Sequence, residues 1–361
     1  MTSLEPFERD ADVVRRAIAL LRARLPITWA VETAFDVRID GRSFDATVEL
    51  APPSGPALHL LAESKRSLVT RDLPAVLEQL ATAAEPTRAI PVIVSRYLSQ
   101  SVRNWLDSRD LSYIDATGNI RLTSDEPVMF LRDQGADRDP WRSAGRPRGT
   151  LRGVPPTRVV RTLVDFSPPL PIRRLVELSG ASTGATYRVL EFLEQEALLT
   201  RGPRGIIETV AWRALLERWA DDYGFARDNP VTRYLAPRGL AALQVSLAAA
   251  DEDLGYAVTG SLAAQLWAPY APPRLATLYI EGDVGIAAKA LGLREVDTGA
   301  NVLLAAATSD VVFDRTSSVS GITYAAPSQV AVDLLDGPGR NPEEGHALLD
   351  WMETNESAWR Q

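Results

Sequence analysis

The chain has 361 residues, of which 45% are hydrophobic, so it is long enough to form two or three packed domains. It contains no cysteine, which excludes disulfide bonds and thiol nucleophiles and fits a reducing compartment. The formal net charge of −8 argues against a nucleic-acid-binding surface that covers the whole molecule.

Two further features of the composition limit location and metal chemistry. No apolar run approaches about 18 residues and the first residues are polar and acidic, so we expect no membrane span, no signal peptide and a cytoplasmic location. With only two histidines, a metal site would consist mainly of carboxylates, which favours Mg²⁺ or Mn²⁺.

The first 132 residues alternate between helical and strand-like patterns. Residues 8–25 carry apolar side chains at helical spacing, namely Val13, Val14, Ala17, Ile18 and Leu21. From Thr28 onward, short strand-like segments are separated by helical stretches at 73–84 and 100–109. This alternation predicts an α/β or α+β domain over residues 1–132.

A hairpin is predicted around the Pro- and Gly-containing segment APPSGPA, residues 51–57. A turn centred near Ser54 sets Leu50 opposite Leu58 and Val48 opposite Leu60. The same register sets Asp45 opposite Glu63, and Lys65 points to the same face because strand side chains alternate.

Asp45, Glu63 and Lys65 have a chemical logic as a group. Two carboxylates can hold Mg²⁺ or Mn²⁺ against a phosphodiester, and a lysine can position or activate the attacking water. Of 39 basic residues only Lys65 and Lys289 are lysine, which favours a role for Lys65 that arginine cannot perform. The alternative is that these charges are simply solvated at the end of a strand.

The spacing of Asp45 and Glu63-Ser64-Lys65, with seventeen residues between the two acids, resembles the core of the PD-(D/E)xK restriction-endonuclease-like superfamily. That fold places the equivalent residues on adjacent strands, although here Phe44 replaces the expected proline. The resemblance implies a metal held by Asp45 and Glu63 and catalysis assisted by Lys65. Glu32 or Glu8 is a candidate for an additional ligand.

Residues 133–156 are rich in Arg, Gly and Pro and predict a basic linker or arm. Residues 138–175, the basic segment, contain nine arginines and only two acidic residues, Asp139 and Asp165. Residues 157–212 then follow the order helix, helix, turn, helix and hairpin, which predicts a winged helix-turn-helix. The alternative use of such a module is protein contact.

In a winged helix-turn-helix, the third helix enters the major groove of double-stranded DNA. The first part of that helix carries side chains suited to base edges and phosphates, namely Ser182, Thr183, Thr186, Tyr187 and Arg188. The wing adds Arg201 and Arg204. The DNA backbone would be lined by Arg158, Arg161, Arg173 and Arg174.

The last module, residues 213–361, combines helical and strand-like segments. Residues 258–270 and 275–283 resemble the Gly-Ser turn, helix and strand that open a nucleotidyltransferase-like fold. The expected Asp-x-Asp is absent, and only Glu281 and Asp283 follow later, so we expect a degenerate member without nucleotidyl transfer. The fold class is therefore multidomain α/β and α+β.

Residues 96–122, the winged helix and residues 324–352 together resemble the AbiEi-type transcriptional regulators, the antitoxins of type IV toxin–antitoxin systems. The stretches Tyr113–Asn119 and Ala326–Leu335 carry most of this resemblance. It implies a bacterial DNA-binding repressor, with a nucleotidyltransferase-like toxin as partner, and leaves a homodimer open. Asp115 and Asn119 also fit an ordinary β-turn.

The sequence thus supports two main hypotheses. The first is a DNA-binding regulator of the antitoxin type, in which the winged helix and the nuclease-like domain both contact DNA. The second is a magnesium-dependent DNA endonuclease that uses Asp45, Glu63 and Lys65. A protein scaffold is a third reading, which leaves the basic middle of the chain unexplained.

Overall fold

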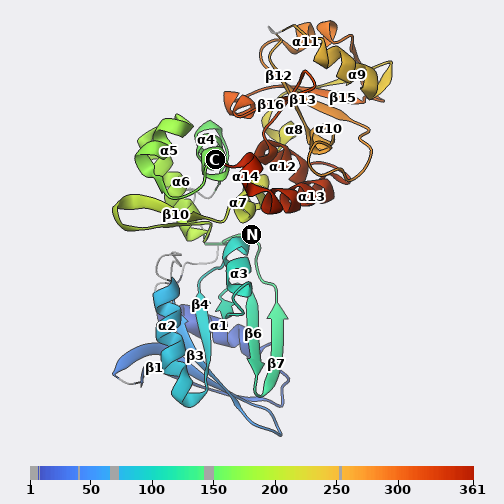
Figure 1. Cartoon of the computed structure of the whole chain (residues 1–361). Coiled ribbons are helices and arrows are strands. Elements are labelled where there is room, and N and C mark those ends of the chain that lie inside the picture. Colours follow the sequence, from blue (N-terminus) through green and yellow to red (C-terminus); the bar gives the residue numbers. More distant parts are fainter. Residues whose placement is uncertain (1–6, 8, 40, 66–72, 142–149, 252–253) are drawn as a thin grey trace. The chain divides into compact units, whose positions relative to one another are not determined.

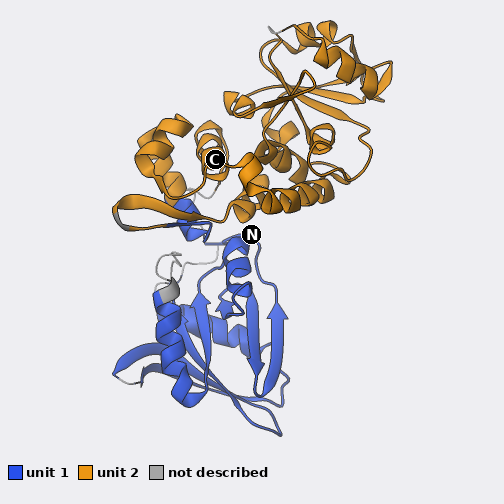
Figure 2. Ribbon diagram, in the orientation of Figure 1, with its two compact units in different colours: residues 1–147, 191–200 blue, residues 148–190, 201–361 orange. Residues whose placement is uncertain are grey.

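The computed structural model describes residues 7, 9–39, 41–65, 73–141, 150–251 and 254–361. These residues form a mixed α/β protein with three sheets (Figure 1). The chain divides into two compact units: unit 1 comprises residues 1–147 and 191–200, and unit 2 comprises residues 148–190 and 201–361 (Figure 2). The finer division at residues 132, 156 and 212 stays a prediction.

Unit 1 contains a seven-stranded sheet whose strands follow one another in chain order. They are β1 (Ala30–Ile39), β2 (Arg42–Ala51), β3 (Leu58–Ser64), β4 (Ile90–Ser95), β5 (Ser112–Asp115), β6 (Ile120–Asp125) and β7 (Val128–Asp133). The pairs β3–β4 and β4–β5 are parallel, and the other neighbouring pairs are antiparallel. The carboxyl ends of β3, β4 and β5 therefore share one edge of the sheet.

Helices cover both faces of this sheet. The helix α1 (Asp10–Arg22) packs on one face, and its five predicted apolar positions are all buried. On the other face lie α2 (Leu73–Ala84), the short helix η1 (Glu85–Thr87) and α3 (Gln100–Asp107) (Figure 1). Because strand side chains alternate, Leu60 and Ala62 face α1, whereas Leu61 faces α2 and α3.

A three-helix segment with a small sheet follows. It contains α4 (Val154–Asp165), β8 (Leu170–Pro171), α5 (Ile172–Ser179), α6 (Thr183–Gln195), β9 (Leu199–Arg201), η2 (Pro203–Gly205) and β10 (Ile206–Val210). The three strands pair in the order β8-β10-β9. Gly180 ends α5 with a φ of 60°, a left-handed conformation that glycine adopts without steric cost.

Unit 2 also contains a second seven-stranded sheet, in the order β14-β11-β15-β13-β12-β17-β16. Its strands are β11 (Val231–Leu235), β12 (Tyr256–Thr259), β13 (Ala276–Ile280), β14 (Arg294–Glu295), β15 (Val302–Ala306), β16 (Ser317–Val319) and β17 (Ile322–Tyr324). The helices are α7 (Trp212–Ala220), α8 (Phe225–Asp228), α9 (Gly239–Ala248), α10 (Gly260–Ala264), α11 (Val284–Ala290), η3 (Asp310–Phe313), α12 (Pro327–Leu335), α13 (Asn341–Thr354) and α14 (Glu356–Trp359).

A buried polar network joins α4 to α12 inside unit 2. The Arg161 side chain is 1% exposed and donates to Asp165 Oδ2 at 3.0 Å and to Gln329 Oε1 at 2.9 Å. Ser328 donates its hydroxyl proton to Asp165. The prediction that Arg161 lines the DNA backbone is therefore wrong, because its guanidinium is enclosed by these partners. Ser328 and Gln329 belong to the stretch Ala326–Leu335, which carries much of the AbiEi resemblance.

Candidate DNA-binding surface and acidic pair

The first turns of α6 expose several of the side chains that the sequence assigns to DNA contact. Ser182 precedes the helix, and its hydroxyl accepts a hydrogen bond from Ala185 N at 3.3 Å. The exposed residues are Ser182, Thr183, Tyr187 and Arg188, with Tyr187 43% exposed. Hydroxyl groups, an aromatic ring and a guanidinium thus share the start of one helix.

Arg188 lies along the surface of α6 toward its beginning. A Cβ atom added to Gly184 would meet Arg188 Nη1 at 3.6 Å, so the glycine leaves room for the guanidinium. Within the described residues Arg188 forms no ion pair. Its charge is therefore available at the amino-terminal end of α6, where the helix dipole also favours anions.

Thr186 does not belong to this surface. Its side chain is fully buried, and its hydroxyl donates to Ser182 O at 3.1 Å. The helical position places it on the inward face with Val189 and Leu190. The prediction that Thr186 contacts DNA is corrected on this ground.

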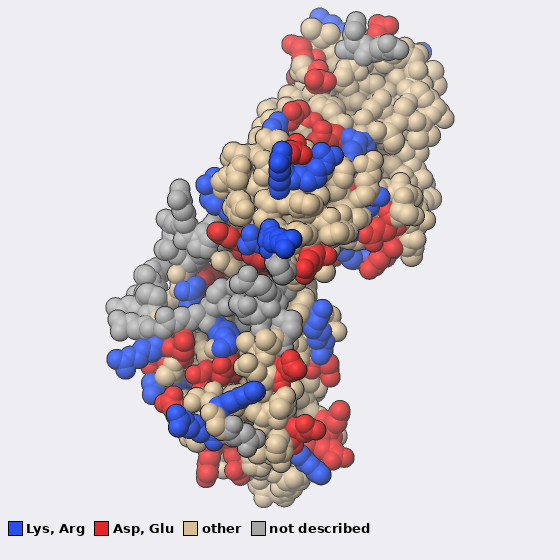
Figure 3. Space-filling model, turned by 60° about the vertical axis from the view of Figure 1, so that its left-hand side comes forward, with Lys and Arg blue, Asp and Glu red and all other residues tan. Residues whose placement is uncertain are grey.

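The arginines around α6 differ in how much free charge they offer. Arg204 is exposed in η2, at a φ of 64°, and Arg201 is half-buried in β9. Arg173 and Arg174 both pair with Glu177, at 3.1 Å and 3.5 Å. The surface in Figure 3 accordingly mixes basic and acidic side chains instead of forming one unbroken basic area.

Several arginines of the basic segment contribute less charge than their number predicts. Arg158 forms an ion pair with Asp310, and Arg161 forms the buried pair described above. Arg142, Arg146 and Arg148 lie outside the described residues. The basic character of the segment therefore rests on fewer free side chains than the nine arginines suggest.

The predicted acidic pair lies where the first residues of β2 run beside the carboxyl end of β3. The observed register pairs Val48 with Leu60 and Leu50 with Leu58, which confirms the predicted hairpin. The same register, continued past the last observed pair, sets Asp45 opposite Glu63. Asp45 Oδ2 accepts a hydrogen bond from the backbone nitrogen of Ser64 at 2.6 Å, so its carboxylate reaches across to β3.

Lys65 completes this group. Its Nζ lies 2.8 Å from Glu63 Oε1, with the lysine side chain 37% and the glutamate side chain 20% exposed. The backbone anchors the lysine to β4, because Lys65 N donates to Val94 O and Ser95 Oγ donates to Lys65 O, each at 2.9 Å. The three predicted residues are thus neighbours on the sheet edge.

Carboxylate oxygens such as those of Asp45 and Glu63 are the type of ligand that magnesium and manganese ions prefer. Within the described residues, no cluster of three or more Asp, Glu, His or Cys side chains is arranged to hold a metal. Mg²⁺ usually binds one or two carboxylates and completes its shell with water and phosphate oxygens. Asp45 and Glu63 would hold such an ion, which would stabilise negative charge on a phosphodiester.

Of the two additional ligands considered from the sequence, Glu32 lies too far along the sheet to complete the pair. In the strand register Glu32 on β1 lies opposite Glu49 on β2. Glu49 is four residues from Asp45, a distance of about 13 Å along the strand. Glu8 lies outside the described residues. Asp115 is fully buried and accepts hydrogen bonds from the turn that it begins, including Thr117 N at 2.8 Å. This supports its reading as a turn residue.

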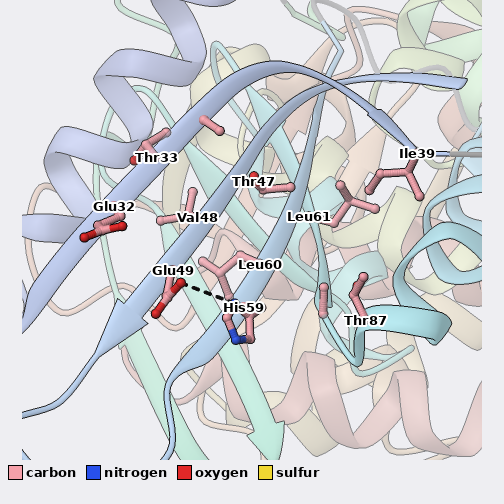
Figure 4. A pocket seen from close by; sticks show the side chains of 12 residues that line it. Glu32, Thr33, Ile39, Thr47, Val48, Glu49, His59, Leu60, Leu61 and Thr87 are labelled. Carbon is pink, nitrogen blue, oxygen red and sulfur yellow. Dashed lines mark ion pairs between the residues drawn. The ribbon is translucent and has the colours of Figure 1, made fainter.

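A groove of about 370 Å³ lies on strands β1, β2 and β3 of the same unit (Figure 4). Its lining includes Glu32, Glu49 and His59, and His59 Nδ1 lies 3.9 Å from Glu49 Oε2. Two carboxylates among its polar side chains repel phosphate groups. The groove is therefore poorly suited to bind a DNA backbone.

The Gly-Ser turn of unit 2 starts α10. Gly260 has a φ of 64°, and a Cβ there would meet Thr277 Oγ1 at 3.2 Å, so Thr277 occupies the position next to the turn. Asp283 accepts a hydrogen bond from Ile286 N at 2.9 Å and caps α11. Glu281 lies against Gly255 at the other end of β12. Neither of these two acids lies beside the Gly-Ser turn.

Comparisons of the chain with models of protein families, with curated proteins and with solved structures found no match. Among the helices of the described residues, none has the length and apolar character needed to span a membrane.

Proposed function

We propose that the protein is a DNA-binding transcriptional regulator of the antitoxin type, which binds double-stranded DNA through a winged helix formed by residues 157–212. The observation that carries the proposal is the exposed start of α6, where Thr183, Tyr187 and Arg188 lie together and Arg188 has no ion-pair partner among the described residues. The AbiEi resemblance adds a nucleotidyltransferase-like toxin as the proposed partner.

Helix geometry supports the assignment. A helix end that presents backbone N–H groups and a guanidinium attracts phosphate, and side chains in its first turns reach base edges in the major groove. Arg204 in η2 lies in the segment that would form the wing. Since much of the surrounding charge is paired, binding would depend on a few side chains and not on a broad basic surface.

The test is the salt dependence of binding. Purified protein is titrated into labelled genomic fragments that include its own promoter, beside Arg188→Ala and a control, Arg238→Ala, which removes an exposed arginine in front of α9. We expect Arg188→Ala to weaken binding and to reduce the salt slope by about 1, with the control unchanged. An absent or salt-insensitive shift of every fragment would refute the proposal.

A second candidate is a magnesium-dependent DNA endonuclease with a restriction-endonuclease-like domain in residues 1–132. The observation that favours it is the contact of Asp45 with Ser64 N, beside the Glu63–Lys65 pair. In this proposal Asp45 and Glu63 hold the metal, and Lys65 positions the attacking water.

The endonuclease is tested by incubating the protein with duplex and branched DNA in Mg²⁺ or Mn²⁺. Asp45→Ala and Lys65→Ala are compared with Glu49→Gln, which removes a carboxylate four residues further along β2. Metal-dependent cleavage that both alanine variants lose and the control retains would establish the nuclease. DNA binding without cleavage by the wild-type protein would exclude this candidate.

A further inference from the structure

Arg158 and Asp310 form an ion pair inside unit 2, in which a single guanidinium nitrogen contacts both carboxylate oxygens. Arg158 Nη2 lies 2.7 Å from Asp310 Oδ1 and 2.9 Å from Asp310 Oδ2. Arg158 belongs to α4, whereas Asp310 begins η3 in the C-terminal part of the chain. The hydrogen bonds from Arg158 lower the pKa of the Asp310 carboxyl, so the aspartate is ionised near neutral pH.

The pair lies beside the start of α6. A Cβ atom added to Gly180, in the turn between α5 and α6, would meet Arg158 Nη1 at 3.5 Å. Gly180 is two residues before Ser182, the residue that precedes the exposed end of α6. The Arg158 guanidinium therefore lies next to the surface that we propose for DNA, with a carboxylate already bound to it.

Asp310 is held in place by the core, although its own side chain is 74% exposed. The two residues that follow it, Val311 and Val312, are buried at 2% exposure each. The buried Arg161 donates to Val311 O at 3.1 Å and so fixes the backbone of η3 relative to α4. The backbone of Asp310 is thus held in place, whereas its carboxylate group is accessible to solvent.

We propose that Asp310 occupies the position of a DNA phosphate on Arg158 and so withholds this arginine from DNA. The inference rests on the proposed function, and it adds an internal competitor at the edge of the same surface. A carboxylate and a phosphate both accept charge-assisted hydrogen bonds from a guanidinium nitrogen, so either can occupy this position on Arg158. The C-terminal part of unit 2 therefore lowers the affinity of the three-helix segment for DNA.

The exposure of the pair determines the size of the effect. An ion pair between exposed side chains contributes little free energy and is screened by salt, so the gain in affinity expected when Arg158 is released from Asp310 is small. We expect Asp310→Asn to tighten DNA binding by about two- to fivefold. Because Arg158 would then contact a phosphate without competition, the slope of log affinity against log salt becomes steeper by about 0.9.

The experiment is a double-mutant cycle read by fluorescence anisotropy with a labelled duplex of random sequence, at about 50 to 200 mM salt. It compares the full-length wild type, Asp310→Asn, Arg158→Ala and the double variant. The control is Asp350→Asn, since Asp350 is 70% exposed and pairs with Arg213 on α7, so it removes an equal charge from a matched pair. Asp310 is exposed enough for the substitution to leave the fold intact.

The proposal predicts that Arg158→Ala changes wild-type affinity by less than about twofold but abolishes the gain produced by Asp310→Asn. It is overturned if Arg158→Ala weakens the wild type as strongly as the Asp310→Asn protein. It is also overturned if Asp310→Asn and Asp350→Asn have the same effect, because the change would then reflect net charge alone. Absence of salt-dependent binding by every variant would overturn the proposed function as well.

Discussion

Asp333 provides a direct test of the buried network in unit 2. Its carboxylate is buried and accepts hydrogen bonds from Thr259 Oγ1 at 2.5 Å, Tyr279 OH at 2.7 Å and Gln329 Nε2 at 2.9 Å. Burial raises the pKa of Asp333 from 3.8 to about 6, and these donors, together with Arg161, only partly oppose the effect. The raised pKa means that folding favours the protonated acid.

The pH dependence follows from the two pKa values. Below about pH 4 the carboxyl is protonated in both the folded and the unfolded chain, and above about pH 6 it is ionised in both. Asp333 therefore stabilises the native state at low pH, and this contribution is lost as the pH rises through about 6. At about 1.36 kcal/mol per pH unit, the loss amounts to about 3 kcal/mol.

The assay compares urea unfolding of the wild type and Asp333→Asn between about pH 4 and pH 7. Tryptophan fluorescence includes a signal from unit 2, where Trp219 is buried and stacked on Tyr223 with ring centroids 4.8 Å apart. Other titrating groups cancel in the difference between the two proteins. We expect the wild type to lose about 3 kcal/mol relative to the variant across this range. A difference that stays constant with pH would refute the reasoning.

Three further substitutions test the packing within the two units. Arg161→Leu should lower the free energy of unfolding by about 3 to 5 kcal/mol, because it leaves Asp165 buried without its cation; a urea titration showing a loss below about 1 kcal/mol would contradict this. Gly180→Ala should cost about 1 kcal/mol in the same assay, since a φ of 60° strains a residue with a Cβ, and an unchanged midpoint would argue against the left-handed turn. Leu80→Ala should cost about 2 to 5 kcal/mol, measured on the unfolding transition of unit 1, because the side chain is fully buried; a neutral result would mean that α2 does not pack as described.

The local pattern of the sequence determined much of unit 1. Helical spacing identified all five buried positions of α1, and Pro and Gly in the turn at residues 51–57 fixed the register of β2 and β3. Both depend on neighbours within one element or one hairpin, where side-chain direction follows from backbone geometry alone. The position of Asp45 opposite Glu63, with Lys65 beside Glu63, followed from the same rule.

Charge and residue type were poorer guides to which side chains are available. Thr186 and Arg161 are polar and lie in the predicted winged helix-turn-helix, yet both are buried. A helix turns 100° per residue, so its polar side chains can point inward where a partner exists, as Gln329 does for Arg161. That partner is 168 residues away in the sequence, and no local pattern could identify it.

The sequence by itself therefore determined the first helix, the first hairpin and the candidate residues, because these depend on periodicity and on turn chemistry. Only the tertiary structure decided which arginines remain free. The C-terminal part of unit 2 brings Asp310 to Arg158 and Gln329 to Arg161, whereas Arg188 has no such partner among the described residues. Whether a positive charge is available depends on the carboxylates and carbonyls that the fold brings near it, and these come from distant parts of the chain.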